Sequence, residues 1–354
     1  MRERRALVAM LCLIQACGRD PTTPAVGLSA GCQIVGAAIG RVPITQLIDH
    51  TYLGFTGGLY PGCANTPPAA HDSAGLARGK SVQPLDVNGI PGTGGKVVLM
   101  SLGMSNTTQE FCSFSFLPPC DSWTFMGQAA SDPAVNHSTL AMVNAARGGQ
   151  SADFWLTSTA TNYDLVRDNW LTPNGLSEKQ VQIVWIKVAN PNPTISLPSA
   201  SADAYALVTQ MGKIVRALKT RYPNLKQVFF SSRIYGGYGL GLNPEPYAYE
   251  SAFAVKWLIE AQIAQMKNAG AVVDTRAGDL NLNTGTPWLG WSAYLWADGT
   301  TPRADGLVWN RSDIDTDGAH PTQSGETKVG AMLLTFFKGS PYSKCWFVAG
   351  GTCP

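Results

Sequence analysis

The chain has 354 residues, of which 45% are apolar and 14% charged, a composition that suits a folded domain and argues against intrinsic disorder. Lysine and arginine number 26 against 24 acidic residues, so the formal net charge is only +2. Proteins that bind nucleic acids usually carry a strong excess of positive charge, and no nucleic-acid partner is therefore expected.

The first residues have the pattern of an export signal. Three arginines at positions 2, 4 and 5 precede the apolar run 6–14, and the small residue Ala16 follows. This run is far shorter than the ~20 residues that span a bilayer, so residues 1–17 are predicted to be a secretory signal peptide. Cys17 after Ile14-Gln15-Ala16 resembles a bacterial lipoprotein box, and a lipid anchor there is the only membrane contact expected. The protein is expected to be secreted, periplasmic or at the cell surface.

Six cysteines follow the signal region, and no Cys-x-x-Cys pair that would indicate a zinc ribbon is present. An even number of cysteines in an exported chain favours disulfides over buried free thiols. Six cysteines permit about 15 connectivities, of which pairing between neighbours along the chain is the simplest. The expected bridges are Cys32–Cys63, Cys112–Cys120 and Cys345–Cys353.

Strand and helix patterns alternate from residue 96 onwards. Short apolar runs typical of buried parallel strands lie at 97–102, 139–145, 181–188 and 227–231, and a fifth strand is expected at 271–274. Helical spacing recurs at 203–218, 248–268 and 329–336. Repeated βα units predict a three-layer α/β/α sandwich with a mostly parallel five-stranded sheet.

Two segments do not fit this alternation. Residues 18–95 are rich in Gly, Pro and Thr, and are predicted to form a tail and an irregular layer before a domain at 96–354. Residues 281–310 hold four tryptophans among glycines, and are predicted to be an insertion that could form a hairpin. The tryptophans are expected mainly to pack this segment down.

Ser105 lies where a strand pattern meets a helix start. The strand at 97–102 runs into Gly103-Met104-Ser105-Asn106, and Thr107 and Glu110 have the spacing of a capping box. Open α/β sheets bind ligands at the carboxyl ends of their strands, and a helix N-terminus there favours negative charge. Ser105 is therefore the candidate nucleophile. Ser29 in Gly27-Leu28-Ser29-Ala30-Gly31 matches a G-x-S-x-G elbow, but no strand precedes it and no helix follows.

A carboxylate precedes one of the four histidines by three residues, in Asp317-Gly318-Ala319-His320. Such a carboxylate can accept the N–H of one ring nitrogen and leave the other nitrogen free to take a serine proton. An alternative hypothesis is a metal-dependent phosphoesterase, whose metal ligands would be Asp313, Asp315, Asp317 and His320. The acidic residue that closes a calcium loop is lacking, so no metal site is expected.

Together, Ser105 after the first strand and D-x-x-H-P before the last helix resemble the SGNH (GDSL-like) hydrolase superfamily. The resemblance implies a flavodoxin-like fold, no cofactor, and a triad of Ser105, His320 and Asp317. It also implies an oxyanion hole formed by the N–H groups of Ser105 and Gly149 and by the side chain of Asn190. Met104 stands where the family has aspartate, and Ala189-Asn190-Pro191 replaces its Gly-x-Asn-Asp. The sequences at 103–106 and 148–151 look more like the sialate and xylan O-acetylesterase branches.

The expected function is hydrolysis of short-chain esters, acetyl first, on a small ester or an acetylated carbohydrate. The segments around Ser105, Gly149 and Asn190 are rich in small and polar residues, which favours a shallow polar cleft. Asn106, Arg233, Tyr235 and Trp309 are the candidate substrate contacts. The alternatives are a catalytically silent carbohydrate-binding protein on the same fold and a lipase-like or polyester-type hydrolase of longer acyl esters.

Overall fold

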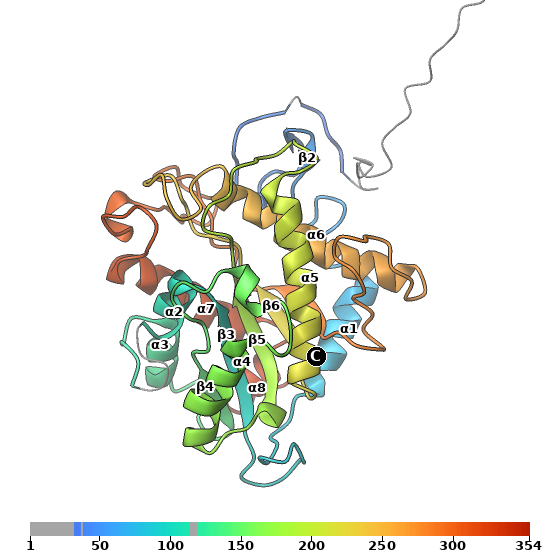
Figure 1. Ribbon diagram of the computed structural model, residues 1–354, viewed down its shortest axis with the longest axis vertical. Helices are drawn as coiled ribbons and strands as arrows, with labels where there is room; N and C mark the ends of the chain where they lie inside the picture. Colours follow the sequence, from blue (N-terminus) through green and yellow to red (C-terminus); the bar gives the residue numbers. More distant parts are fainter. Residues whose placement is uncertain (1–31, 37, 114–118) are drawn as a thin grey trace, which may run out of the picture.

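A parallel five-stranded sheet forms the centre of the protein (Figure 1). The computed structural model describes residues 32–36, 38–113 and 119–354, and the predicted signal peptide with Cys17 lies outside this part of the chain. The strands lie in the order β4-β3-β5-β6-β7, and every neighbouring pair is parallel. Their bounds are β3 Val97–Gly103, β4 Leu140–Val143, β5 Val181–Lys187, β6 Gln227–Phe230 and β7 Trp288–Trp291.

Helices cover both faces of this sheet and give the three-layer α/β/α architecture that the sequence predicts. Buried side chains of α4, α5 and α6 form one core with the sheet, and those of α2, α3, α7 and α8 form a second core on the opposite face. In Figure 1, α5 lies in front of the sheet and α8 behind it. The helix bounds are α1 Ala69–Lys80, α2 Ser105–Cys112, α3 Phe125–Ser131, α4 Thr161–Val166, α5 Asp203–Arg221, α6 Tyr247–Lys267, α7 Gln323–Gly339 and α8 Lys344–Phe347.

The two cores explain why β3 is apolar throughout except at Ser101, whose buried hydroxyl donates to Oδ1 of Asn144 at 2.7 Å. Val98, Met100 and Leu102 belong to the core beneath α5, whereas Val97 and Leu99 belong to the core beneath α7. All five side chains are at most 1% exposed. Because successive side chains of a strand point to opposite faces, a sheet covered on both faces needs apolar residues at every position.

The fifth strand does not lie where the sequence predicted it. Residues 271–274 form no strand, and Val272 and Val273 are 41% and 53% exposed. The fifth strand is instead β7, which pairs in parallel with β6 and lies within the tryptophan-rich segment 281–310. Two adjacent valines fit a strand pattern, but the Trp-Leu-Gly-Trp sequence of β7 buries much more apolar surface at the sheet edge.

An antiparallel strand pair and a helix precede the first strand of the sheet. The strands β1 (Thr51–Tyr52) and β2 (Phe55–Thr56) pair with each other. Tyr52 stacks on Phe253 of α6, with 5.8 Å between ring centroids. This N-terminal layer is therefore fixed to the α6 side of the sheet by aromatic contacts.

No sequence pattern predicts α1, although this helix has 12 residues. Its buried residues are His71, Gly75 and Gly79, so it lacks the apolar stripe by which an amphipathic helix is usually predicted. The glycines allow a close approach, because a Cβ atom on Gly75 would lie 2.6 Å from the ring of Trp288. Among the described residues, no helix is long and apolar enough to cross a membrane.

The structure contains the three predicted disulfides, which suit an oxidising compartment. The Cα–Cα distances are 5.4 Å for Cys32–Cys63, 4.9 Å for Cys112–Cys120 and 4.8 Å for Cys345–Cys353.

We expect the exported protein to contain no titratable thiol in these six positions. Replacing both Cys345 and Cys353 with alanine should lower the free energy of unfolding by about 2–3 kcal/mol, because the short cross-linked loop restricts the unfolded chain. Mass spectrometry of unreduced peptides tests the pairing, and urea unfolding tests the stability. Free thiols at four or more of the six positions would refute the disulfide framework.

A buried glutamate on α6 links stability to pH. Glu250 accepts hydrogen bonds from the hydroxyl of Tyr52 (3.0 Å) and from the backbone N–H of Leu197 (3.0 Å). Burial, only partly opposed by these hydrogen bonds, raises the pKa of Glu250 from 4.5 to about 7. The folded state therefore holds this proton more tightly than the unfolded state does.

We expect the contribution of Glu250 to stability to be complete below pH 4.5 and to be lost as the pH rises through about 7. At about 1.4 kcal/mol per pKa unit, the loss amounts to roughly 3–4 kcal/mol. The Glu250→Gln variant should lack this part of the pH dependence in urea unfolding measured from pH 4.5 to 8. Parallel curves for the variant and the original protein would contradict the assignment.

Candidate active site

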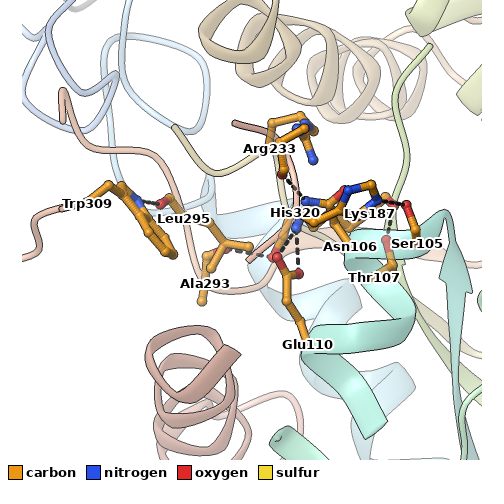
Figure 2. Close-up of polar contacts among 12 residues, drawn as sticks. Ser105, Asn106, Thr107, Glu110, Lys187, Arg233, Ala293, Leu295, Trp309 and His320 are labelled. Atoms are coloured by element: carbon orange, nitrogen blue, oxygen red, sulfur yellow. Dashed lines mark hydrogen bonds and ion pairs between the residues drawn. The ribbon is translucent and has the colours of Figure 1, made fainter. Parts of the chain in front are cut away.

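Ser105 lies at the junction of β3 and α2, as the sequence predicted, and Gly103 shapes the turn. Gly103 has φ 157°, and a Cβ atom there would lie 2.2 Å from the carbonyl oxygen of Lys187 and 2.5 Å from Oγ1 of Thr107. Only glycine allows β3 and β5 to approach this closely just before the serine. Figure 2 shows Ser105 at the first turn of α2.

The predicted capping box does not form. The helix begins at Ser105 itself, and the residue before it, Met104, makes no side-chain cap. Thr107 instead donates its hydroxyl to the carbonyl oxygen of Lys187 at 2.6 Å, and Glu110 contacts the ammonium group of Lys187. Tertiary partners have replaced the local hydrogen bonds, so the pattern located the helix but misplaced its N-cap by three positions, at Thr107 instead of Met104.

The structure brings together the three residues predicted to act as a triad. Oγ of Ser105 lies 2.6 Å from Nε2 of His320 (Figure 2). Nδ1 of His320 contacts Oδ2 of Asp317. The other oxygen of Asp317 accepts the backbone N–H groups of Ala319 (2.9 Å) and His320 (3.0 Å). This order of contacts is the one that lets an imidazole take a serine proton while a carboxylate holds its ring.

The loop that carries His320 is fixed from two sides. The amide of Asn106 donates to the carbonyl oxygen of Ala319 at 2.7 Å, which ties the loop to the first turn of α2. Gly318 has φ 74°, and a Cβ atom there would lie 2.4 Å from Cα of Gly239. Asn106, predicted as a substrate contact, therefore uses its amide within the protein.

Hydrogen bonds keep Asp317 charged. Burial alone would raise its pKa, but the hydrogen bonds from the ring of His320 and from two backbone N–H groups outweigh burial, and the net pKa of Asp317 is lowered. A charged carboxylate in this position can accept the Nδ1–H of the imidazole and hold the ring in one orientation.

A small pocket opens beside Ser105, with a volume of about 60 Å³. Both residues predicted for the oxyanion hole, Gly149 and Asn190, line it. The Gly149 loop is held near the serine because Arg147 N–H donates to the carbonyl oxygen of Gly103 at 3.0 Å. Nδ2 of Asn190 donates one hydrogen bond, to Gln210 at 2.8 Å, which leaves a second N–H on the same nitrogen.

The other predicted substrate contacts have different positions. Arg233 lines the pocket and is 1% exposed. Tyr235 packs against Tyr238, with ring centroids 5.1 Å apart, and does not line the pocket. Trp309 is fully buried and donates to the carbonyl oxygen of Leu295, so it offers no face on which a sugar could stack.

A buried ion pair beneath the serine was not predicted. The ammonium group of Lys187 contacts both carboxylate oxygens of Glu110, and neither side chain is exposed. Burial raises the pKa of Glu110 and lowers that of Lys187, while the contact between them opposes both shifts. In the sequence, the sign of this ion pair is Lys187, the one charged residue of the apolar strand β5.

The aspartates of the rival metal site point to other partners. Asp313 contacts the ammonium group of Lys328 and accepts a hydrogen bond from Ser324 at 2.6 Å. Within the part of the chain that the structure describes, no three His, Cys, Asp or Glu side chains gather where they could hold a metal ion.

Comparison with known proteins gives structural matches alone. No family model and no curated protein sequence matches the chain. The psychrotrophic esterase EstA from Pseudoalteromonas is 11% identical over 69% of this chain and 97% of its own, with a TM-score of 0.36. A protein from Slackia heliotrinireducens described as an SGNH hydrolase is 14% identical over 68% of this chain and 98% of its own, with a TM-score of 0.30. A family two carbohydrate esterase from Cellvibrio japonicus is 10% identical over 70% of this chain and 62% of its own, with a TM-score of 0.34. The solved structures that this chain resembles thus include SGNH and other ester hydrolases.

Proposed function

We propose that the protein is an SGNH-type serine esterase. The observation that carries this proposal is the contact of Ser105 Oγ with His320 Nε2 at 2.6 Å, while Asp317 holds the opposite ring nitrogen. A serine, a histidine and a carboxylate in this order form the usual machinery of acyl transfer.

In the proposed reaction, Oγ of Ser105 attacks the ester carbonyl carbon while Nε2 of His320 takes its proton. The carbonyl oxygen becomes an oxyanion, which the N–H groups of Ser105, Gly149 and Asn190 stabilise. The C–O bond to the alcohol then breaks, and His320 gives its proton to the leaving alcohol. Water, deprotonated by His320, releases the acyl group as a carboxylic acid and restores Ser105.

The small pocket supports a short acyl group. Its volume of about 60 Å³ is well below the roughly 150 Å³ of a cavity that holds benzene. The apolar side chains of Met104, Ala189 and Leu242 line it together with the polar Asn190, Ser151 and Arg233. This lining suits a methyl group, whereas a long acyl chain would need a longer, continuous apolar groove. We therefore propose acetyl as the preferred acyl group and a carbohydrate or similarly polar alcohol as its carrier.

Export of the enzyme is also part of the proposal. The disulfides and the signal pattern at residues 1–17 support a secreted or surface-attached enzyme, with a lipid at Cys17 as the one membrane anchor.

We expect hydrolysis of 4-nitrophenyl esters to be fastest for acetate and to fall with chain length. The drop in kcat/KM from acetyl to octanoyl should be at least about tenfold, since each 1.4 kcal/mol of lost fit costs that factor. Initial rates from acetyl to octanoyl, with acetylated xylan as a polymeric substrate, provide the test. A rate that climbs toward octanoyl would favour a lipase-like enzyme, and absence of any turnover would favour a silent binding protein.

A further inference from the structure

The pocket beside Ser105 contains a buried positive charge without an acidic partner. Arg233 follows β6, is 1% exposed, and lines the pocket together with Ser105 and Asn190. Nη2 of Arg233 donates to the carbonyl oxygen of Leu242 at 3.4 Å. Nε and Nη1 have no hydrogen-bond partner among the described residues.

Such an arrangement is costly unless a ligand completes it. Removing a guanidinium from water without a compensating charge or full hydrogen bonding is strongly unfavourable. Among the described residues, no carboxylate lies within ion-pair distance of Arg233, and the nearby acidic groups pair with other residues.

The acidic groups that act on Arg233 from further away are already in use. Three carboxylates influence its charge electrostatically, and each of them has a closer partner. The pairs are Glu110 with Lys187, Glu245 with the indole N–H of Trp296, and Asp317 with His320. Arg233 is thus the uncompensated positive charge of the pocket.

Two unpaired acceptors line the same pocket. The side-chain oxygens of Asn190 and Asn243 are buried and have no hydrogen-bond partner among the described residues. A hydroxyl group next to an anionic group would donate to such oxygens, whereas an anion alone would not.

From these observations, and resting on the proposed esterase function, we propose that Arg233 binds a carboxylate of the substrate close to the scissile ester. A planar guanidinium offers two parallel N–H donors that match a carboxylate. The unpaired oxygens of Asn190 and Asn243 fit hydroxyl groups beside that carboxylate. The preferred substrate is then an acetylated sugar acid or hydroxy acid, with Arg233 determining specificity.

The test compares charged and uncharged esters. In the alcohol arm, the acetyl ester of methyl glucuronoside is compared with that of methyl glucoside. In the acyl arm, 4-nitrophenyl hemisuccinate is compared with its uncharged succinamate. We expect kcat/KM to favour the charged member by at least about tenfold in one arm, because hydrogen bonds to charged groups are the stronger kind. The arm that shows the preference identifies which side of the ester carries the carboxylate.

Variants assign the preference to Arg233. In Arg233→Gln the charged-to-uncharged ratio should fall to about one, whereas Arg216→Gln should keep the ratio. Arg216 is a suitable control because it lies on α5 and donates to the carbonyl oxygens of Ala277 and Asp279. Equal losses on both esters in Arg233→Gln would overturn the proposal, as would a ratio of one or below in both arms of the original protein.

A binding measurement keeps the inference separate from the proposed function. Calorimetric titration of the Ser105→Ala protein with glucuronate and with glucose requires no turnover and leaves Arg233 intact. Binding of glucuronate, weaker at high salt, with at least about tenfold weaker binding of glucose, is the expected result. If no ester is hydrolysed but glucuronate binds, only the esterase proposal fails. If esters are hydrolysed, neither arm favours the charged ester and glucuronate does not bind better than glucose, only the carboxylate proposal fails.

Discussion

Ser105→Ala is expected to reduce ester hydrolysis by roughly four to six orders of magnitude without unfolding the protein. The substitution removes the oxygen that lies 2.6 Å from Nε2 of His320 and leaves the backbone of α2 in place. What activity remains would come from the oxyanion-hole donors and from substrate binding. Initial rates on 4-nitrophenyl acetate, with circular dichroism to verify folding, measure the effect.

Ser29→Ala is the matched control for this experiment. Ser29 lies in the one G-x-S-x-G sequence of the chain, outside the described residues, and its substitution should leave the rate unchanged. If Ser29→Ala were the inactive variant and Ser105→Ala were active, the proposed site would be wrong.

Lys187→Met is expected to lower the free energy of unfolding by about 3–5 kcal/mol. Lys187 is the ion-pair partner of Glu110, and both side chains are completely buried. Removing the ammonium group leaves a carboxylate uncompensated in the interior, or forces it to bind a proton. Since Glu110 lies on the same helix as Ser105, we also expect lower activity in this variant.

A second substitution distinguishes loss of the pair from loss of packing. The double variant Lys187→Met, Glu110→Leu should recover most of the lost stability, because no unpaired charge remains buried. Lys338→Met breaks an exposed pair with Asp132, whose side chains are 37% and 17% exposed, and should cost less than about 1 kcal/mol. Urea unfolding of the four proteins measures these differences. A double variant as unstable as Lys187→Met, or less stable, would refute the buried-pair explanation.

The pattern of apolar residues was sufficient to predict the strands whose two faces are both buried. β3 and β5 are fully buried, and their apolar runs stand out from any surrounding sequence. The same reasoning failed for β7, because tryptophan and glycine in a segment rich in turn residues do not resemble a strand. It also missed α1, whose buried face consists largely of glycine and therefore has no hydrophobic periodicity.

The positions of Ser105, Asp317 and His320 could be predicted because each lies next to a local signal, either a strand end or a helix start. Their contacts join residues 215 positions apart in the chain, and only the folded structure, with the loop of His320 held by Asn106, brings them together. The roles predicted for Asn106 and Trp309 depended on which way their side chains point. Asn106 lines the pocket but donates its amide N–H to Ala319, and Trp309 is buried and donates to Leu295.

The sequence by itself determined the α/β/α architecture, the neighbouring cysteine pairs and the three residues of the candidate triad, since these follow from periodicity and short spacings. Only the tertiary structure decided which charged side chains are buried. Lys187 and Glu110 are buried as a pair, whereas Arg233 is buried without an acidic partner. The physical reason is that the cost of burying a charge depends on every group packed around it. Those groups come from β3, β5, β6 and the helices, which are distant in sequence and meet only in the folded chain.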